Sequence, residues 1–199
     1  MHIRRLAVDG AFEFTPDCYR DDRGLFVSPM QERAFVAATG HRFLVAQINH
    51  SRSARNVLRG LHYTSTPPGQ AKYVHCAHGR AVDVVVDIRI GSPTFGAWEM
   101  VEMDTTSFRA VYLPVGVGHA FLAQCDDTVM SYLVTSDYQA ELEHAIDPLD
   151  PELALPWPKD VEFILSERDR NAPTLAQARD RLPRYEDCVA SPESLVLPR

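Results

Sequence analysis

The chain has 199 residues, which is enough for one generous domain with its own core and too few for two comfortable domains. Hydrophobic residues make up 45% and charged residues 24%, which is ordinary for a soluble globular protein. The net charge of −7 disfavours nucleic acid as a partner, because phosphate backbones require a basic face, but it still allows a small anionic ligand held by a few converging arginines.

The sequence also lacks the marks of membrane-bound and secreted proteins. No apolar run approaches the roughly 18 residues that span a bilayer, and residues 1–5 lack the apolar stretch of a signal peptide. The cysteines form no C-x-x-C pair and stand far apart, at Cys18, Cys76, Cys125 and Cys188. We therefore expect a cytoplasmic protein without membrane contact, zinc knuckle or disulfide framework.

The predicted elements begin with a short helix over Pro29–Thr39, closed by Gly40 as C-cap. Strand-like runs then dominate from Phe43 to Ser136. In order they are Leu44–His50, Val57–Tyr63, Lys72–Cys76, Ala81–Ile90, Trp98–Met103, Ala110–Leu113, Ala120–Gln124 and Thr128–Val134. Short strands at a spacing of roughly 8–12 residues predict an all-β sandwich or barrel.

The clearest strand is the run 81–90, in which four apolar side chains alternate onto one face: Val82, Val84, Val86 and Ile88. After the strands we expect a surface loop over Asp147–Asp160 and a second short helix over Pro173–Leu182. The chain is thus predicted to be a single domain, residues 1–199. Its core would span about 43–136, with an N-terminal extension over 1–42 and a C-terminal loop and helices over 137–199.

Two histidines raise the question of a metal site. Residues Pro114–His119 read P-x-G-x-x-H, like the second half of the metal motif of cupins. The first half of that motif supplies two histidines and a glutamate, whereas here tyrosine and threonine follow His62. One or two imidazoles alone make a poor transition-metal site. His75 and His78 could complete a cluster, but we interpret His119 as a hydrogen-bonded pocket histidine or a substrate contact and expect no metal.

His62 is then a candidate general base, which requires an acceptor on its other ring nitrogen to fix the tautomer and stabilise the imidazolium. Asp169 could be that acceptor, although its charged segment could equally be a solvated loop. Tyr132 could be a core aromatic of its strand, or it could deliver a proton opposite the base. On a regular strand Arg59 and His62 face opposite ways, unless a bulge intervenes.

Taken together, several segments resemble the dTDP-4-dehydrorhamnose 3,5-epimerase family and follow one another in the family's order. They are Asp22–Phe26, Gln47–Ser51, Leu58–Tyr63, Gln70–Val74, Val82–Asp87, Gly91–Gly96, Asp150–Leu153 and Ser166–Pro173. They cover most of the chain from about residue 6 to 185. Each motif is weak alone, but the ordered set is highly specific.

The resemblance implies a cupin-like jelly roll (a double-stranded β-helix) with short peripheral helices. It also implies a homodimer that exchanges an N-terminal strand, so that Arg23 and Phe26 line the neighbour's site. The catalytic residues it implies are His62 as base, Asp169 as its dyad partner, Tyr132 as the acid on the opposite face and Lys72 beside the ketone oxygen. The implied substrate-binding residues are Arg59, Arg168 and Arg23 on the diphosphate, Tyr138 stacked on the thymine, and Gln47, Asn49, His119 and Glu143 as further ligand contacts.

These roles describe one reaction on a dTDP-linked 4-keto-6-deoxyhexose. Removing a proton next to the C4 ketone yields an enolate whose charge lies mainly on O4, and a cation placed there lowers the barrier. An acid opposite the base then returns a proton to the other face and inverts the carbon. Because the ketone is already the electron sink, we expect no cofactor, and the sequence has no G-x-G-x-x-G dinucleotide fingerprint.

Three runs indicate the branch of the family. Thr66–Val74 and Tyr112–Phe121 resemble the actinomycete antibiotic-sugar branch, and Asp21–Pro29 is similar to the C5-epimerase of vancosamine-type sugar formation. Substrates there often carry a C3 without a removable proton, so we expect inversion at C5, with 3,5-double inversion next and C3 alone last. Ser28 departs from the family, which usually has a glutamate at that position and so gains a carboxylate contact.

Other protein classes are compatible with the same residues. A 3,4-ketoisomerase would use the same nucleotide sugar, and product NMR would identify it. A metal-dependent cupin would lose activity with its metal, and a non-catalytic nucleotide-sugar-binding cupin would not need the intact catalytic set.

Overall fold

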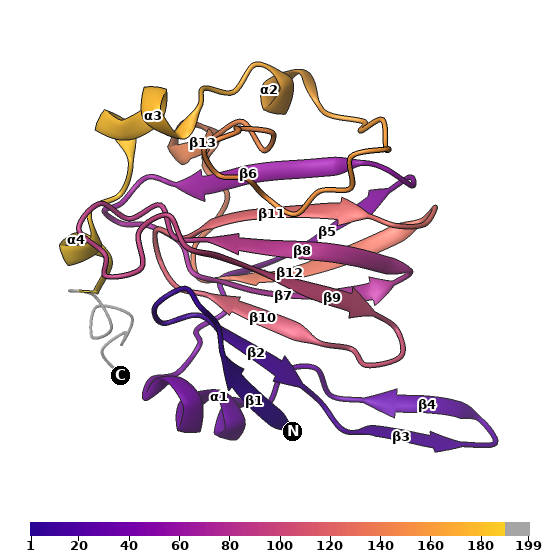
Figure 1. Cartoon of the computed structure of the whole chain (residues 1–199). Helices are drawn as coiled ribbons and strands as arrows, with labels where there is room; N and C mark the ends of the chain where they lie inside the picture. Colours follow the sequence, from indigo (N-terminus) through magenta and orange to yellow (C-terminus); the bar gives the residue numbers. More distant parts are fainter. Residues whose placement is uncertain (190–199) are drawn as a thin grey trace.

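The chain folds into two antiparallel sheets packed face to face, in a computed structural model that describes residues 1–189 (Figure 1). The six-stranded sheet has the order β1 (His2–Arg5), β2 (Phe12–Thr15), β10 (Ala110–Leu113), β7 (Lys72–His78), β12 (Thr128–Val134), β5 (Gln47–Ser53). The five-stranded sheet has the order β13 (Glu143–Ala145), β6 (Leu58–Thr64), β11 (Gly118–Ala123), β8 (Arg80–Val86), β9 (Trp98–Asp104). β3 (Cys18–Asp21) and β4 (Gly24–Val27) form a separate hairpin that projects from the body of the molecule (Figure 1).

The helices are short and lie at the periphery of the sheets. They are α1 (Glu32–Thr39), α2 (Glu167–Arg170), α3 (Leu175–Ala178) and α4 (Tyr185–Val189), with the 3₁₀ turns η1 (Ala140–Leu142) and η2 (Arg179–Arg181). This architecture confirms the expected all-β jelly roll with short peripheral helices. No helix within residues 1–189 has the length and apolar character needed to cross a membrane.

Apolar side chains fill the space between the two sheets and cover part of their outer faces. Between the sheets, Val74 and Met130 of the six-stranded sheet pack in one cluster with Val85 and Phe121 of the five-stranded sheet. Each such side chain contributes about 1.5–3 kcal/mol on burial. Other parts of the chain cover the outer face at β8, and β8 is therefore buried on both sides.

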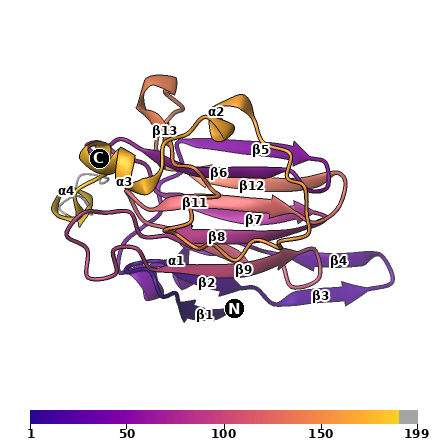
Figure 2. The same ribbon diagram turned by 45° about the horizontal axis from the view of Figure 1, so that its top comes forward.

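The outer face of the five-stranded sheet carries the predicted row of Val82, Val84, Val86 and Ile88, which packs against the C-terminal segment. Figure 2 shows this segment crossing the sheet after β13. On the outer face of the six-stranded sheet, α1 inserts Phe35, which is 1% exposed and makes an edge-on contact with Tyr112 at 4.9 Å between ring centroids. The C-terminal segment and α1 thus lie on the outer faces of the sheets, and the space between the sheets is where a pocket can form.

Several element boundaries differ from the sequence-based expectation. α1 begins at Glu32 rather than Pro29, but it ends at the predicted Gly40, whose φ of 82° suits a glycine C-cap and whose amide donates to the Val36 carbonyl. The predicted helix over 173–182 is split into α3 and η2. The strand expected from Leu44 begins at Gln47. Strands β1 to β4 and β13 were not individually predicted.

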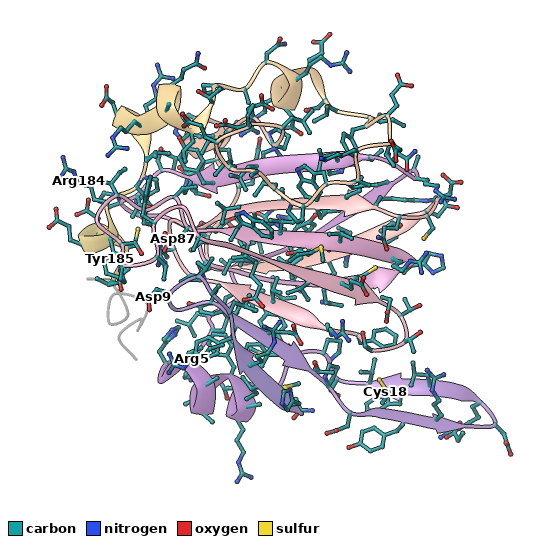
Figure 3. The ribbon with its side chains drawn as sticks, in the orientation of Figure 1. Arg5, Asp9, Cys18, Asp87, Arg184 and Tyr185 are labelled. Carbon is teal, nitrogen blue, oxygen red and sulfur yellow. The ribbon has the colours of Figure 1, made fainter. Side chains whose placement is uncertain are left out.

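A buried ion pair ties the two ends of the described chain to the five-stranded sheet. Arg89, which is 1% exposed, donates two hydrogen bonds to the fully buried Asp87 carboxylate and a third to the Asp9 carbonyl. Tyr185 of α4 donates to the Asp9 carboxylate at 2.5 Å. Figure 3 shows Asp9, Asp87 and Tyr185 together at one end of the sheets. This network fixes the N-terminal loop and α4 in place.

Candidate active site

A cavity of about 220 Å³ lies between the two sheets, and we refer to it as the central pocket. Its lining comes from strands of both sheets and from the segment after β12. The lining residues are Asn49, His50, Ser51, Arg59, His62, Gln70, Lys72, His119, Phe121, Tyr132, Val134, Tyr138 and Glu143. Eight of the predicted site residues are among them: Asn49, Arg59, His62, Lys72, His119, Tyr132, Tyr138 and Glu143.

A bulge in β6 brings Arg59 and His62 to the same pocket. The pairing of β6 with β11 joins His119 to His62 and Phe121 to Arg59, so three steps on β6 match two on β11. Gly60 occupies this bulge with a φ of 117°, a conformation that L side chains rarely adopt. A Cβ at this position would lie 2.5 Å from the His119 carbonyl oxygen. The bulge named as the exception is therefore present, and Arg59 and His62 do not face opposite ways as they would on a regular strand.

His62 forms a dyad with Asp169. The His62 Nε2 lies 2.6 Å from the Asp169 Oδ1, and the Asp169 side chain is 3% exposed. Ser166 caps the N-terminus of α2 by accepting a hydrogen bond from the Asp169 amide, which fixes the backbone that carries the carboxylate. Because Nε2 is engaged by the carboxylate, Nδ1 is the ring nitrogen left free to accept a proton from a ligand.

The electrostatics of the dyad keep Asp169 charged. Burial alone would raise the pKa of this carboxyl, but the hydrogen bond and charge of His62, with support from the Gly60 amide, lower it below the usual range. A charged carboxylate at this position stabilises an imidazolium at His62. The dyad therefore suits His62 to act as a base, because the Asp169 carboxylate stabilises the ring after it has gained a proton.

Tyr132 approaches the pocket from β12, on the sheet that faces His62. Burial raises the pKa of its phenol, while a hydrogen bond with Ser51 lowers it. The Ser51 Oγ lies 3.2 Å from the phenol oxygen. The phenol therefore stays protonated in the neutral pH range and is available as a proton donor.

Lys72 lies on β7, next to β12, and its ammonium group is held inside the protein. Burial lowers the pKa of Lys72, the Glu143 carboxylate raises it, and the charge of Arg168 lowers it. Glu143 itself accepts a hydrogen bond from the Thr64 hydroxyl at 2.8 Å. This arrangement leaves a cation in the pocket wall whose three protons are not committed to hydrogen bonds within residues 1–189.

His119 takes part in a second histidine–aspartate pair. Its Nε2 lies 2.6 Å from the Oδ2 of Asp83, and both side chains are buried. The other carboxylate oxygen of Asp83 has no hydrogen-bond partner within the described part of the chain. His119 is thus a hydrogen-bonded pocket histidine, as the sequence suggested. Within residues 1–189 there is no group of three or more histidine, cysteine, aspartate or glutamate side chains that could hold a metal ion.

Several other predicted residues lie in or beside the pocket. Gln47 does not line it but holds two neighbours that do, donating to Asn49 at 2.5 Å and accepting from the Tyr138 amide at 2.9 Å. Tyr138 is 57% exposed, so its ring is available to a ligand. Arg168 lies outside the central pocket, in an adjoining groove that also contains Arg59, His62 and Asp169.

Arg23 and Phe26 lie apart from the central pocket, on the projecting hairpin. Phe26 is 67% exposed, and within residues 1–189 the one ion pair of Arg23 is with Asp21. That these two residues belong to a neighbour's site stays a prediction.

Five lining residues carried no predicted role: His50, Ser51, Gln70, Phe121 and Val134. Ser51 could have been found from the strand period, because Gln47, Asn49 and Ser51 alternate onto the same face of β5. Gln70 precedes β7 and donates to Ser136, a long-range contact with no local sequence signal.

The arrangement as a whole can move a proton across a ligand. A base with a charged partner stands on one sheet, and a protonated phenol stands on the other. An ammonium beside the phenol can stabilise negative charge that develops on an oxygen between them. Two arginines, one in the pocket and one in the adjoining groove, suit an extended anion.

Comparison with known proteins gives consistent matches along the chain. A family model described as dTDP-4-dehydrorhamnose 3,5-epimerase matches residues 5–177. The dTDP-4-dehydrorhamnose 3,5-epimerase of Mycolicibacterium smegmatis is 46% identical over 197 residues, which is 98% of this chain and 97% of the relative.

Two crystal structures are also similar. NovW, a 4-keto-6-deoxy sugar epimerase from the novobiocin gene cluster of Streptomyces spheroides, is 46% identical with a TM-score of 0.91, covering 94% of this chain and 95% of its own. ChmJ, a 3′-monoepimerase from Streptomyces bikiniensis in complex with dTDP-quinovose, is 47% identical with a TM-score of 0.91, covering 96% and 97%.

Proposed function

Because the chain belongs to the dTDP-4-dehydrorhamnose 3,5-epimerase family, we propose that it inverts a carbon next to the C4 ketone of a dTDP-linked 4-keto-6-deoxyhexose. The observation that carries this proposal is the convergence of His62, Tyr132 and Lys72 on one cavity. The similarity to NovW agrees with the expected relation to antibiotic-sugar enzymes.

The reaction follows from the geometry of the pocket. His62 Nδ1 removes the proton from the carbon, and the electron pair moves through the new carbon–carbon double bond onto O4. The Lys72 ammonium stabilises the resulting enolate, which is often the largest catalytic contribution. Tyr132 then donates its proton to the opposite face of the same carbon. The carbon is inverted, and afterwards His62 releases its proton to solvent while the phenolate takes one up.

The nucleotide would be held by the remaining predicted residues. Arg59 is positioned by Ser53, which accepts a hydrogen bond from its Nε at 3.1 Å, and Arg168 extends the cationic surface into the adjoining groove. Guanidinium groups suit a diphosphate because they bind its oxygens in a bidentate manner. The exposed ring of Tyr138 is suited to stack on the thymine. We assign Gln47, Asn49, His119 and Glu143 to the other ligand contacts.

We further propose that the protein acts as a homodimer in the cytoplasm. The β3–β4 hairpin exposes Tyr19 and Phe26, which are 64% and 67% exposed, beside the charged Arg23. Aromatic side chains beside an arginine are typical of a protein interface. In the proposed dimer this hairpin reaches the partner subunit's pocket, where Arg23 adds a cation to the diphosphate site.

We propose C5 as the carbon that is inverted, as the sequence of the run 21–29 suggests. A second candidate is inversion at C3, which is favoured by the 47% identity to a 3′-monoepimerase. The same base and acid can serve both carbons, since each is adjacent to the ketone. Product analysis must decide between them.

The test is proton NMR in D₂O with a dTDP-4-keto-6-deoxyhexose. The wild-type protein should label the inverted carbon with deuterium and give the inverted product, and the labelled position distinguishes C5 from C3. His62→Ala should abolish labelling at both carbons. Labelling at near wild-type rate in this variant, or no labelling by the wild-type protein, would contradict the proposed function.

A further inference from the structure

A serine hydroxyl lies beside the phenol that we assign as the acid. Ser51 on β5 and Tyr132 on β12 extend from neighbouring strands into the central pocket. Their hydroxyl oxygens are 3.2 Å apart. Among residues 1–189 this is the one hydrogen bond that the phenol makes with another side chain.

The direction of this hydrogen bond follows from the proposed role of the Tyr132 phenol as the acid. Tyr132 must direct its own proton toward the substrate carbon, so its oxygen accepts the hydrogen bond with Ser51 rather than donating it. Ser51 is then the donor. A donor at the phenol oxygen stabilises the negative charge that grows there as the proton leaves.

The surroundings of the phenol oppose its loss of a proton, and the Ser51 hydrogen bond acts against this effect. Burial raises the pKa of Tyr132, the hydrogen bond from Ser51 lowers it, and the Asp83 carboxylate raises it again. The charge of Arg59 also lowers this pKa, but Ser51 is the one side chain within residues 1–189 that forms a hydrogen bond with the phenol oxygen. Without that bond the phenolate left behind would lose its direct donor, and the phenol would be a weaker acid. The pairing of Met130 with Ser51 and of Tyr132 with Asn49 holds the two hydroxyls in this diagonal contact.

We propose that Ser51 is a positioning residue for proton return: it orients the Tyr132 phenol and stabilises the phenolate that forms when Tyr132 protonates the substrate carbon. In this step the O–H bond of Tyr132 breaks, the enolate electron pair forms the new C–H bond, and the negative charge passes from O4 to the phenol oxygen. Ser51 takes no part in removal of the first proton, which His62 performs from the other sheet. This inference rests on the proposed function and extends it to one further residue.

The test separates proton removal from inversion. In D₂O, His62 can remove a proton and return a deuteron to the same face, so label enters the substrate even when the acid fails. Ser51→Ala should slow inversion by about 10- to 100-fold, the range expected for a hydrogen bond to a charged group, while label still enters at near wild-type rate. Ser51→Thr, which keeps the hydroxyl, should restore inversion. In a Tyr132→Phe background, Ser51→Ala should have no further effect on inversion.

Each outcome bears on the inference. Label entry in Ser51→Ala shows that the variant is folded and binds substrate, so a loss confined to inversion supports the role. Wild-type inversion in Ser51→Ala would overturn it. A loss of label entry and inversion together, not restored by Ser51→Thr, would also overturn it and make Ser51 a purely structural residue. If wild-type protein neither labels nor inverts the sugar, the proposed function fails, which is a different result.

Discussion

Replacing Asp169 by asparagine tests whether the dyad supplies charge as well as geometry. Asparagine keeps an oxygen that can accept from His62 Nε2 at the observed 2.6 Å, but it removes the negative charge. Two opposite charges about 4 Å apart at an effective dielectric of about 20 interact by about 4 kcal/mol. Part of this interaction is lost because the His62 side chain is 30% exposed. We therefore expect the imidazolium to lose about 2–4 kcal/mol of stabilisation, which is about 30- to 1,000-fold in the rate of proton removal.

The assay is the initial rate of deuterium entry into the 4-keto sugar in D₂O, at saturating substrate. Asp150→Asn is the matched control, because Asp150 is also buried and accepts backbone hydrogen bonds from Glu152 and Leu175, away from the pocket. The control should leave label entry unchanged. Deuterium entry at wild-type rate in Asp169→Asn would refute the dyad, since it would show that the carboxylate does not stabilise the protonated base.

Three further predictions concern the ammonium, the buried ion pair and the hairpin. Lys72→Met should slow label entry and inversion together, by about 10²–10³-fold, because the enolate loses its stabilising cation. In the wild-type protein, burial lowers the pKa of Lys72, so a pH–rate profile should show activity falling as pH rises, at a pH below the usual lysine value of about 10.4. Asp87→Ala leaves Arg89 buried without its partner, so urea melts should show a free energy of unfolding that is lower by about 3–5 kcal/mol. An unchanged free energy of unfolding would mean that the ion pair does not stabilise the fold. Dimers of Arg23→Ala alone and of His62→Ala alone should both have low activity, because the first lacks a diphosphate contact and the second lacks the base. Mixing the two subunits after partial unfolding should restore about one quarter of wild-type activity, because in a random mixture half the dimers are mixed and each has one intact site. No recovery would mean that the hairpin does not serve the partner's pocket.

The main strands could be predicted because they are short apolar runs separated by turn-forming and polar segments. β10 and β12 begin and end at the predicted residues. The short N-terminal strands carry a weaker signal, because β3 and β4 are largely exposed and have no buried face to impose alternation. The predicted helix over 173–182 is instead the short helix α3 followed directly by the 3₁₀ turn η2, with Leu175, Ala178 and Leu182 packed against the sheet.

The sequence allowed the residues of the site to be predicted, but not how their side chains are arranged around the pocket. The family resemblance indicated His62, Asp169, Tyr132 and Lys72, and the structure brings all but Asp169 to the pocket wall, with Asp169 directly behind His62. Local alternation failed at Gly60, because the bulge depends on the close approach of β11, which is about sixty residues further along the chain. A contact with such a distant strand cannot be predicted from the alternation of side chains along β6.

The proton-removing and proton-returning groups stand on different sheets, with His62 on one and Tyr132 on the other. Their separation therefore depends on the thickness of the apolar layer that keeps the sheets apart, in which Met130 and Val85 pack. A larger or smaller side chain in that layer would shift the acid relative to the base without touching the sugar. The ratio of deuterium exchange to inversion could thus be changed by directed evolution through substitutions in the core between the sheets. These positions do not line the pocket.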